Sequence, residues 1–196
     1  MRYVPLHVHT EYSLLDGAIR NKDYIKFAKE NNFEAVAVTD HGVMYGALEF
    51  YRLGKDMQFK TIIGCEFYVL HGDITQKDAN NRELYHLVLL AKDNTGYKNL
   101  VKLVSIAHID GFYYKPRINR EILEKHSEGL ICLSACVAGE LAQSILNGNK
   151  EEARETAKWY KTLFKDDYYI EIQDHGIEEQ KRTNPELIKI AKEFED

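Results

Sequence analysis

The feature that most constrains this chain is a repeated alternation between short apolar runs and longer amphipathic stretches. The short runs are rich in β-branched residues, as in residues 35–39, and such runs favour buried strands. The longer stretches repeat their apolar residues at helical spacing, as residues 22–31 do with Tyr24, Phe27 and Ala28. Strand followed by helix at this rhythm predicts an α/β domain, with a parallel sheet and helices outside it.

Six strands and seven helices are predicted from this pattern. The predicted strands span residues 3–10, 35–39, 61–69, 86–92, 129–135 and 168–174. The predicted helices span residues 22–31, 43–55, 95–107, 120–125, 138–146, 150–163 and 185–195. Asn184 is predicted to cap the last helix, with Pro185 at its first position. No predicted strand follows that helix, so we expect one domain over residues 1–196, cut before the strand that would complete it.

Composition and charge exclude several classes of protein. With 44% apolar and 29% charged residues, the chain is neither disordered nor a membrane protein. It has no apolar run of the roughly 20 residues that a membrane helix needs, and no signal peptide, so Met1 is interpreted as a genuine start. Three cysteines without paired spacing indicate a reducing cytosol, and we expect a cytoplasmic location. The net charge of −5 gives no support for nonspecific nucleic-acid binding, but it suits a site that collects cations.

The first candidate for a metal site is the pair His7-Val8-His9. On a strand, residues two apart point to the same face, so both imidazoles could share one ion such as zinc, manganese or iron. Two strand histidines without any partner role are the alternative. The pair alone is therefore a weak signal.

Further metal-ligating residues lie at or near the ends of the predicted strands. They are Asp16, Asp40, His41, Glu66, His86 and Cys136. Ligands of parallel α/β folds bind at the carboxyl ends of strands, and several buried carboxylates in one region imply a cation there. Cys136 as a small core residue and His86 as a strand-edge histidine remain alternatives. His71, His108 and His126 are interpreted as solvated.

Two other segments carry weaker signals. The loop over residues 111–117 interleaves aromatic residues with Lys115 and Arg117, which suits base stacking and pairing with phosphate. Packing of this aromatic loop on a neighbouring domain is an equally good reading. Asp174 and His175 end a predicted strand and are interpreted as residues that support a ligand or face a substrate.

Several strings in this sequence match a known family. The strings His7-x-His9-Thr10-x-Tyr12-Ser13-x-x-Asp16-Gly17, Thr39-Asp40-His41-Gly42 and Ile63-Gly64-Cys65-Glu66 resemble the PHP (polymerase and histidinol phosphatase) family. Residues 85–92 with 95–100, and residues 111–117, resemble more specifically the N-terminal PHP domain of the alpha subunit of bacterial replicative DNA polymerase III. The resemblance covers essentially the whole chain.

The resemblance implies a distorted (β/α)7 TIM-like barrel with two to three metal ions, zinc or manganese, in its mouth. Carried over position by position, the implied ligands are His7, His9, Asp16, His41, Glu66, His86 and Cys136. Among them His9, Asp16 and His41 are also the candidate catalytic residues, and Asp40 is expected to orient a ligand. A final Asp-x-His motif of the family is not among the 196 residues, so incomplete or weakened metal binding is expected.

Three functions are compatible with this resemblance. The first is metal-assisted phosphodiester hydrolysis, as in a 3′→5′ exonuclease acting on the 3′ end of DNA. The second is a structural platform that contacts the remaining polymerase domains and a separate proofreading exonuclease subunit, with metal supporting only the fold. The third is a free-standing phosphoesterase for small phosphates, which the polymerase-like strings argue against. Polymerisation of DNA is not expected, because no polymerase domain is present.

Overall fold

The computed structural model describes residues 3–14, 16–78 and 82–194. The helices are α1 (Asn21–Glu30), α2 (Ala47–Asp56), α3 (Asn94–Ile109), α4 (Arg120–Lys125), α5 (Glu140–Leu146), α6 (Lys150–Phe164), the 3-10 turn η1 (Lys165–Asp167) and α7 (Glu178–Glu193). The strands are β1 (Val36–Val38), β2 (Thr61–Leu70), β3 (Leu84–Ala91), β4 (Arg117–Asn119), β5 (Leu130–Leu133) and β6 (Tyr168–Tyr169). The predicted α/β class is confirmed. In this part of the chain no helix has the length and apolar character needed to cross a bilayer.

The six strands form one mixed sheet in the order β1-β2-β3-β5-β6, with β4 also paired to β2. Strand β3 runs antiparallel to both of its neighbours, so the expectation of a parallel sheet is wrong for this strand. The connection from β2 to β3 contains no helix among its described residues, whereas a parallel crossover usually needs one. Within the described chain, β1 and β6 do not pair with each other, so the sheet is open.

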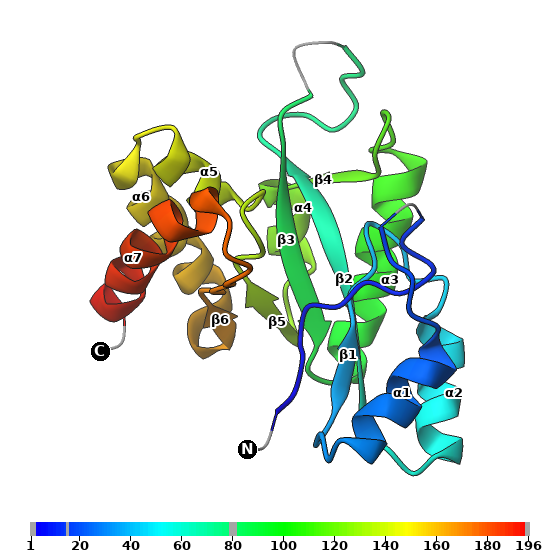
Figure 1. The fold of residues 1–196 in the computed structure, drawn as a ribbon. Helices are drawn as coiled ribbons and strands as arrows, with labels where there is room; N and C mark the ends of the chain where they lie inside the picture. Colours follow the sequence, from blue (N-terminus) through cyan, green and yellow to red (C-terminus); the bar gives the residue numbers. More distant parts are fainter. Residues whose placement is uncertain (1–2, 15, 79–81, 195–196) are drawn as a thin grey trace.

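The sheet separates two apolar layers. On one face Phe67 and Leu87, both fully or almost fully buried, pack in the main core with Leu100 and Leu103 of α3. Helices α5, α6 and α7 gather at one side of the sheet, and α1 and α2 lie together at the other (Figure 1). The opposite face carries only a small cluster, which includes Val88. This second face is the one that carries the candidate metal-binding residues of the sheet.

The N-terminal segment is not a strand, contrary to the prediction for residues 3–10. It nevertheless runs beside β1, because the Ala37 amide donates to the Pro5 carbonyl at 3.1 Å and the Thr39 amide to the Val8 carbonyl at 2.9 Å. Proline has no amide hydrogen, so a regular ladder cannot form along this edge. The segment is held as an extended chain by those few hydrogen bonds.

Several predicted boundaries also differ from the structure. Helix α7 begins at Glu178, seven residues before the predicted start, and Pro185 lies inside it; the predicted end at residue 195 is outside the described residues. Asn184 does not cap a helix, because it lies inside α7. Its side-chain amide donates to the Gln173 carbonyl at 2.8 Å. The last predicted strand shrinks to Tyr168–Tyr169, and β4 was not predicted.

Candidate metal centre

The buried carboxylate of Glu66 lies at the middle of the candidate site. Its side chain is 1% exposed and faces four imidazoles. Oε1 is 3.1 Å from Nε2 of His7 and 3.1 Å from Nδ1 of His86. Oε2 is 3.3 Å from Nε2 of His9 and 2.6 Å from Nδ1 of His41. Four histidines from distant parts of the sequence therefore converge on one carboxylate.

The pairing of β2 with β3 explains how His86 reaches Glu66. Tyr68 pairs with His86 and Glu66 with Val88, and residues two apart on a strand share a face. His86 is near the start of its strand, so in a parallel sheet it would lie at the opposite edge from Glu66. The antiparallel direction of β3 brings it to the same place.

The two N-terminal histidines are positioned by the extended segment. Val8 between them is held at both backbone groups by Thr39, whose hydroxyl accepts from the Val8 amide at 2.8 Å. His7 and His9 flank this anchor, and their ring centroids are 5.1 Å apart. The expected sharing of one face by this pair is seen without a regular strand.

His41 and Asp16 extend the site toward solvent. Oδ2 of Asp16 is 2.7 Å from Nε2 of His41, and the Asp16 side chain is 53% exposed. The His41 ring stacks on the His9 ring with centroids 4.0 Å apart. Asp16, His9 and His41 therefore form the accessible side of the cluster, where a substrate could approach.

Cys136 closes the opposite side of the site. Its Sγ is 3.6 Å from Nδ1 of His86 and 3.9 Å from Oε1 of Glu66. The turn after β5 delivers it, with Ala135 in a left-handed conformation at φ 63°. All three cysteines are free, and Cys136 is the one that is not buried.

Asp40, which is expected to orient a ligand, contacts none of the histidines directly. Its carboxylate accepts from the Thr10 amide at 2.6 Å and from the Ser13 hydroxyl at 2.9 Å. The Ser13 oxygen in turn accepts from the His41 amide at 3.0 Å and lies 3.4 Å from Nδ1 of His9. Asp40 thus orders the loop that carries the histidines, through Ser13.

The donor atoms fall into three groups that could each hold an ion. The groups are His7 with His9 and Glu66, then His9 with Asp16 and His41, and finally His41 with Glu66 and His86. Within each group the ligand atoms lie within 4.8 Å of one another. Imidazole with carboxylate, and a thiol nearby, is a donor set that suits zinc.

Two buried atoms fit a cation better than they fit the protein alone. Oε2 of Glu66 and Nδ1 of His41 are 2.6 Å apart, yet neither has a well-formed hydrogen bond with any described residue. Buried polar atoms are almost always paired, since an unpaired one is costly. A metal ion that both groups bind would satisfy both atoms.

The histidines and Glu66 perturb one another strongly. Burial by itself would raise the pKa of Glu66, but its close contacts with His41, His7 and His86 outweigh burial and hold this pKa far below its usual range. Burial would likewise lower the pKa of His7, whereas its bonds to Glu171 and Glu66 raise it to about 10. The pKa of His86 rises to about 9, because Cys136 and Glu66 outweigh its burial.

These shifts predict that metal binding at pH 7 releases protons. In the metal-free protein His7 and His86 carry protons at pH 7, because their pKa values are about 10 and about 9. A metal ion binds only the neutral ring nitrogens, so affinity should rise with pH toward about 9 to 10. Calorimetry of zinc binding in two buffers of different ionisation enthalpy measures the released protons. Heats that are equal in both buffers would contradict the prediction.

Two further residues of the site were missed by the sequence analysis. Oε1 of Glu171 is 2.8 Å from Nδ1 of His7, and the side-chain amide of Gln173 donates to the same oxygen at 2.7 Å. The only sequence signal was their spacing of two on a predicted strand, which puts them on one face. Asp174, singled out instead, is exposed and accepts from the Gly176 amide at 3.3 Å. The His175 amide donates to Gln180.

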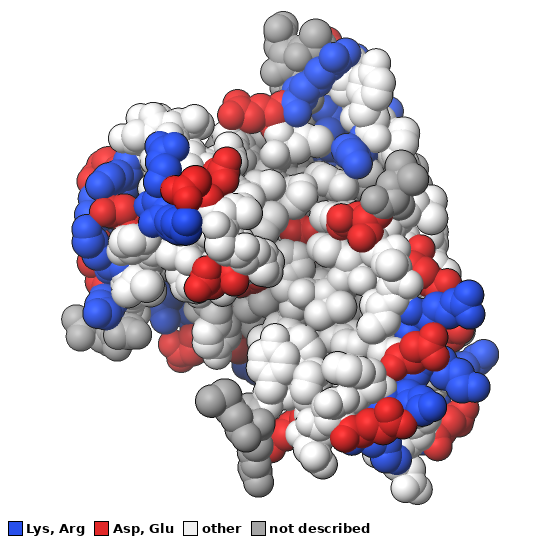
Figure 2. Space-filling model, viewed as in Figure 1, with Lys and Arg blue, Asp and Glu red and all other residues white. Residues whose placement is uncertain are grey.

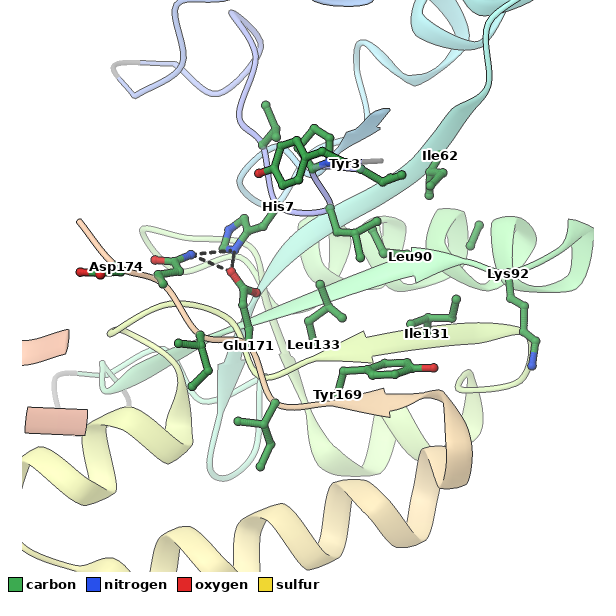
Figure 3. Close-up of a pocket in the computed structure, with 18 of the residues that line it drawn as sticks. Tyr3, His7, Ile62, Leu90, Lys92, Ile131, Leu133, Tyr169, Glu171 and Asp174 are labelled. Atoms are coloured by element: carbon green, nitrogen blue, oxygen red, sulfur yellow. Dashed lines mark hydrogen bonds and ion pairs between the residues drawn. The ribbon is translucent and has the colours of Figure 1, made fainter. Parts of the chain in front are cut away.

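A cavity of about 820 Å³ opens beside His7 and Glu171 (Figure 3). It lies between the N-terminal segment and the chain that follows β6, and sheet residues such as Leu90 and Leu133 form its floor. The metal centre therefore borders an open space on the polar face of the sheet.

The aromatic and basic loop divides into an accessible and a buried part. Lys115 is exposed, and its ammonium lies 5.1 Å from the ring centre of Tyr68, which neighbours His41 and His86. Arg117 is fully buried and donates to the carbonyls of Gly111 at 2.8 Å and Ile74 at 2.7 Å. The assignment of Arg117 to nucleic-acid binding is therefore wrong, since its guanidinium is committed to backbone carbonyls inside the fold.

Replacement of Arg117 by lysine should destabilise the protein by about 1–3 kcal/mol. The planar guanidinium donates to separate buried carbonyls, and the single ammonium of lysine cannot reach all of them. Urea unfolding measures this loss. Lys115→Gln, an exposed change in the same loop, serves as the control and should leave the free energy of unfolding within about 0.5 kcal/mol. Equal stability of the two variants would contradict the structural role of Arg117.

Two of the histidines interpreted as solvated have a polar partner, although the His71 side chain is still 45% exposed. Nε2 of His108 is 2.8 Å from the Gly42 carbonyl, and Nε2 of His71 is 2.7 Å from Oε1 of Glu140. The first of these bonds secures the turn after His41.

Comparison with known proteins places this site in a family context. The PHP domain model matches residues 5–175. DNA polymerase III subunit alpha of Treponema pallidum is 49% identical over 194 residues, and that of Borreliella burgdorferi is 46% identical over 195 residues. The matches cover 97% and 98% of this chain but 17% of each relative, so the chain spans about a sixth of their length.

Similarity to solved structures is partial. A proposed metal-dependent phosphoesterase of Bifidobacterium adolescentis is 17% identical, with a TM-score of 0.41 over 54% of this chain and 33% of the other. An amidohydrolase of Chromobacterium violaceum is 24% identical, with a TM-score of 0.40 over 53% and 32%.

Proposed function

Because the chain belongs to the PHP domain family, we propose that it hydrolyses phosphodiester bonds with the help of bound metal ions. The observation that carries the proposal is the convergence of four imidazoles on the buried carboxylate of Glu66. In the intact protein the reaction would be 3′→5′ exonuclease proofreading at a DNA end, during DNA replication in the cytoplasm; the relatives are named DNA polymerase III subunit alpha.

Two to three ions, zinc or manganese, would supply Lewis acidity that activates water and stabilises charge on the leaving oxygen. His7, His9 and Glu66 would hold one ion, and His86 and Cys136 would hold a neighbour that shares Glu66. Asp16 and His41 would complete the set. We assign catalytic roles to His9, Asp16 and His41, because they form the accessible side of the cluster.

Lys115 would bind the substrate phosphate. Its ammonium lies over Tyr68, whose ring neighbours those of His41 and His86. A cation at this rim would attract a phosphate toward the ions without being a ligand itself. On the face in Figure 2, lysines and arginines lie mostly among aspartates and glutamates rather than in one broad basic patch.

The open sheet also supports the finer proposal of a distorted (β/α)7 barrel. Strands β1 and β6 lie at the two ends of the strand order. The cavity beside His7 lies on the polar face of the sheet, which would be the inside of the barrel.

The second candidate function is a structural platform for the other polymerase domains and for a separate proofreading exonuclease subunit. The net charge of −5 favours it, since a nuclease usually presents positive charge to DNA. In that case the ions would stabilise the fold without turnover.

The test is release of a 3′ label from single-stranded DNA by the purified protein in manganese. His9→Ala is the active-site control, and Lys115→Gln should weaken substrate binding while it leaves metal binding unchanged. Release by the wild type that disappears in His9→Ala supports the nuclease. No release, or equal release by His9→Ala, overturns it; retained metal binding and metal-dependent stability would then support the platform.

A further inference from the structure

Glu171 is a half-buried carboxylate beside the metal centre, outside the set of family ligands. Its side chain is 13% exposed, and that of His7 is 8% exposed. The two imidazole nitrogens of His7 face different carboxylates. Nδ1 faces Glu171 (Figure 3) at a distance of 2.8 Å, and Nε2 is 3.1 Å from Glu66. The ring is thus held between an inner and an outer acid.

The outer acid is itself held rigidly. Ser134 accepts from the Glu171 amide at 2.8 Å through its hydroxyl, and its own amide donates to the Tyr169 carbonyl at 3.0 Å. The Gln173 amide donates to Oε1 of Glu171, the same oxygen that faces His7. This scaffold fixes the direction of the carboxylate, so its contact with His7 is built into the fold.

A carboxylate bound to the outer nitrogen of a histidine has a defined effect on metal binding. It accepts the proton of that nitrogen, so the ring keeps its proton on the outer side and its lone pair on the inner side. It also prevents rotation of the ring and increases its basicity. Both effects favour an ion on the inner nitrogen.

We propose that Glu171 is a positioning residue that keeps the His7 proton on Nδ1 and directs Nε2 toward the ion shared with Glu66. The inference rests on the proposed metal centre, but it assigns a role to a residue that need not touch the ion. The remaining oxygen of Glu171, Oε2, is buried and has no hydrogen-bond partner among the described residues. A carboxylate kept at this cost is better explained by a functional role than by packing.

The test is zinc titration, by competition with a chelating dye, of the wild type, Glu171→Ala, Glu171→Gln and Glu179→Gln. Glu171→Ala should bind zinc about 10–100-fold more weakly, the usual cost of losing such a partner. Glu171→Gln should recover much of that loss, because its carbonyl oxygen can accept the same proton. Glu179→Gln removes an exposed carboxylate in the first turn of α7, outside the site, and should bind as the wild type does.

A spectroscopic measurement separates positioning from general stability. In the zinc-loaded wild type, the Nδ1 proton of His7 should give an imidazole ¹H–¹⁵N signal that exchanges slowly with water. Glu171→Ala should lose this signal, and Glu171→Gln should keep it. Thermal unfolding in EDTA verifies that each variant is folded.

The outcomes distinguish the inference from the proposed function. Equal zinc affinity of the wild type and Glu171→Ala overturns the role of Glu171 and leaves the metal centre intact. Zinc affinity of Glu171→Gln as low as that of Glu171→Ala also overturns it, because Glu171 would then act by its charge or as a ligand. If the wild type binds zinc no better than His9→Ala, the metal centre itself fails.

Discussion

Replacement of Glu66 by glutamine is expected to weaken zinc binding by more than about 100-fold. Loss of a residue that only supports a ligand costs about 10–100-fold, and Glu66 contributes directly to two of the three donor groups. An amide offers one neutral oxygen where the carboxylate offers two charged ones. Its NH2 group would also face the His41 imidazole, whose Nδ1 is 2.6 Å from the present Oε2.

The same substitution should change the proton release described above. Without the carboxylate, the pKa values of His7 and His86 should fall from about 10 and about 9, so fewer protons remain to be displaced at pH 7. Zinc titration by calorimetry measures affinity and proton release together. Glu128→Gln, at an exposed position away from the centre, is the matched control and should match the wild type. Tight zinc binding by Glu66→Gln would remove Glu66 from the middle of the site.

Elements defined by local apolar pattern were predictable from the sequence. The run that forms β1 is buried on every residue, and α4 matches its predicted bounds, with the Asn119 side chain accepting from the Ile122 amide. Strand β4 was missed because its pattern is not local. Arg117 and Asn119 flank a single apolar residue, and the strand exists because it pairs with β2.

The candidate site was predictable as a set of residue types but not as a geometry. His41 follows β1 and Glu66 lies on β2, as the pattern implied. The route by which His86 reaches them was not foreseen, because strand direction depends on the connection and not on the strand's own residues. Glu171 gave only the weak signal of its spacing from Gln173, and a glutamate at such a position is usually solvated. Only the approach of the N-terminal segment, 164 residues away, buries it against His7.

The second large effect is expected at Glu140. This carboxylate is 4% exposed at the start of α5. It accepts from the Tyr160 hydroxyl at 3.1 Å, lies 2.7 Å from Nε2 of His71, and is paired with Arg120. These partners come from α6, from the end of β2 and from α4, so one side chain joins three elements to α5.

Replacement of Glu140 by alanine should destabilise the protein by about 3–5 kcal/mol, the range for removing one partner of a buried ion pair. Guanidinium unfolding at pH 7 measures the loss. Glu152→Ala is the control. Glu152 lines a cavity of about 570 Å³ together with Glu140, but its side chain is exposed, so this change should alter stability by less than about 0.5 kcal/mol. Similar stability of both variants would contradict the prediction.

The pH dependence of this cluster has a definite sign. Burial alone would raise the pKa of Glu140, but the bond from His71 and the charge of Arg120 lower it. Its stabilising contribution is therefore present above the unfolded pKa of 4.5 and is lost as pH falls below it. The bond to Glu140 raises the pKa of His71. The stabilisation from protonated His71 is therefore complete below pH 6.5 and is lost as pH rises through the pKa of His71 in the folded state. Glu140→Ala should lose both dependences.

A double-mutant cycle separates the ion pair from the rest of the network. The Arg120 guanidinium also lies 4.6 Å from the Trp159 ring centre, and its Nε is buried with no hydrogen-bond partner in the described chain. Arg120→Ala alone leaves Glu140 buried with only neutral donors and His71, whereas the double variant removes both charges. Because most of the cost of a broken buried pair is the uncompensated charge, the double variant should lose less stability than the sum of the two single variants. Simple additivity would mean that Glu140 acts through Tyr160 and His71 rather than through Arg120.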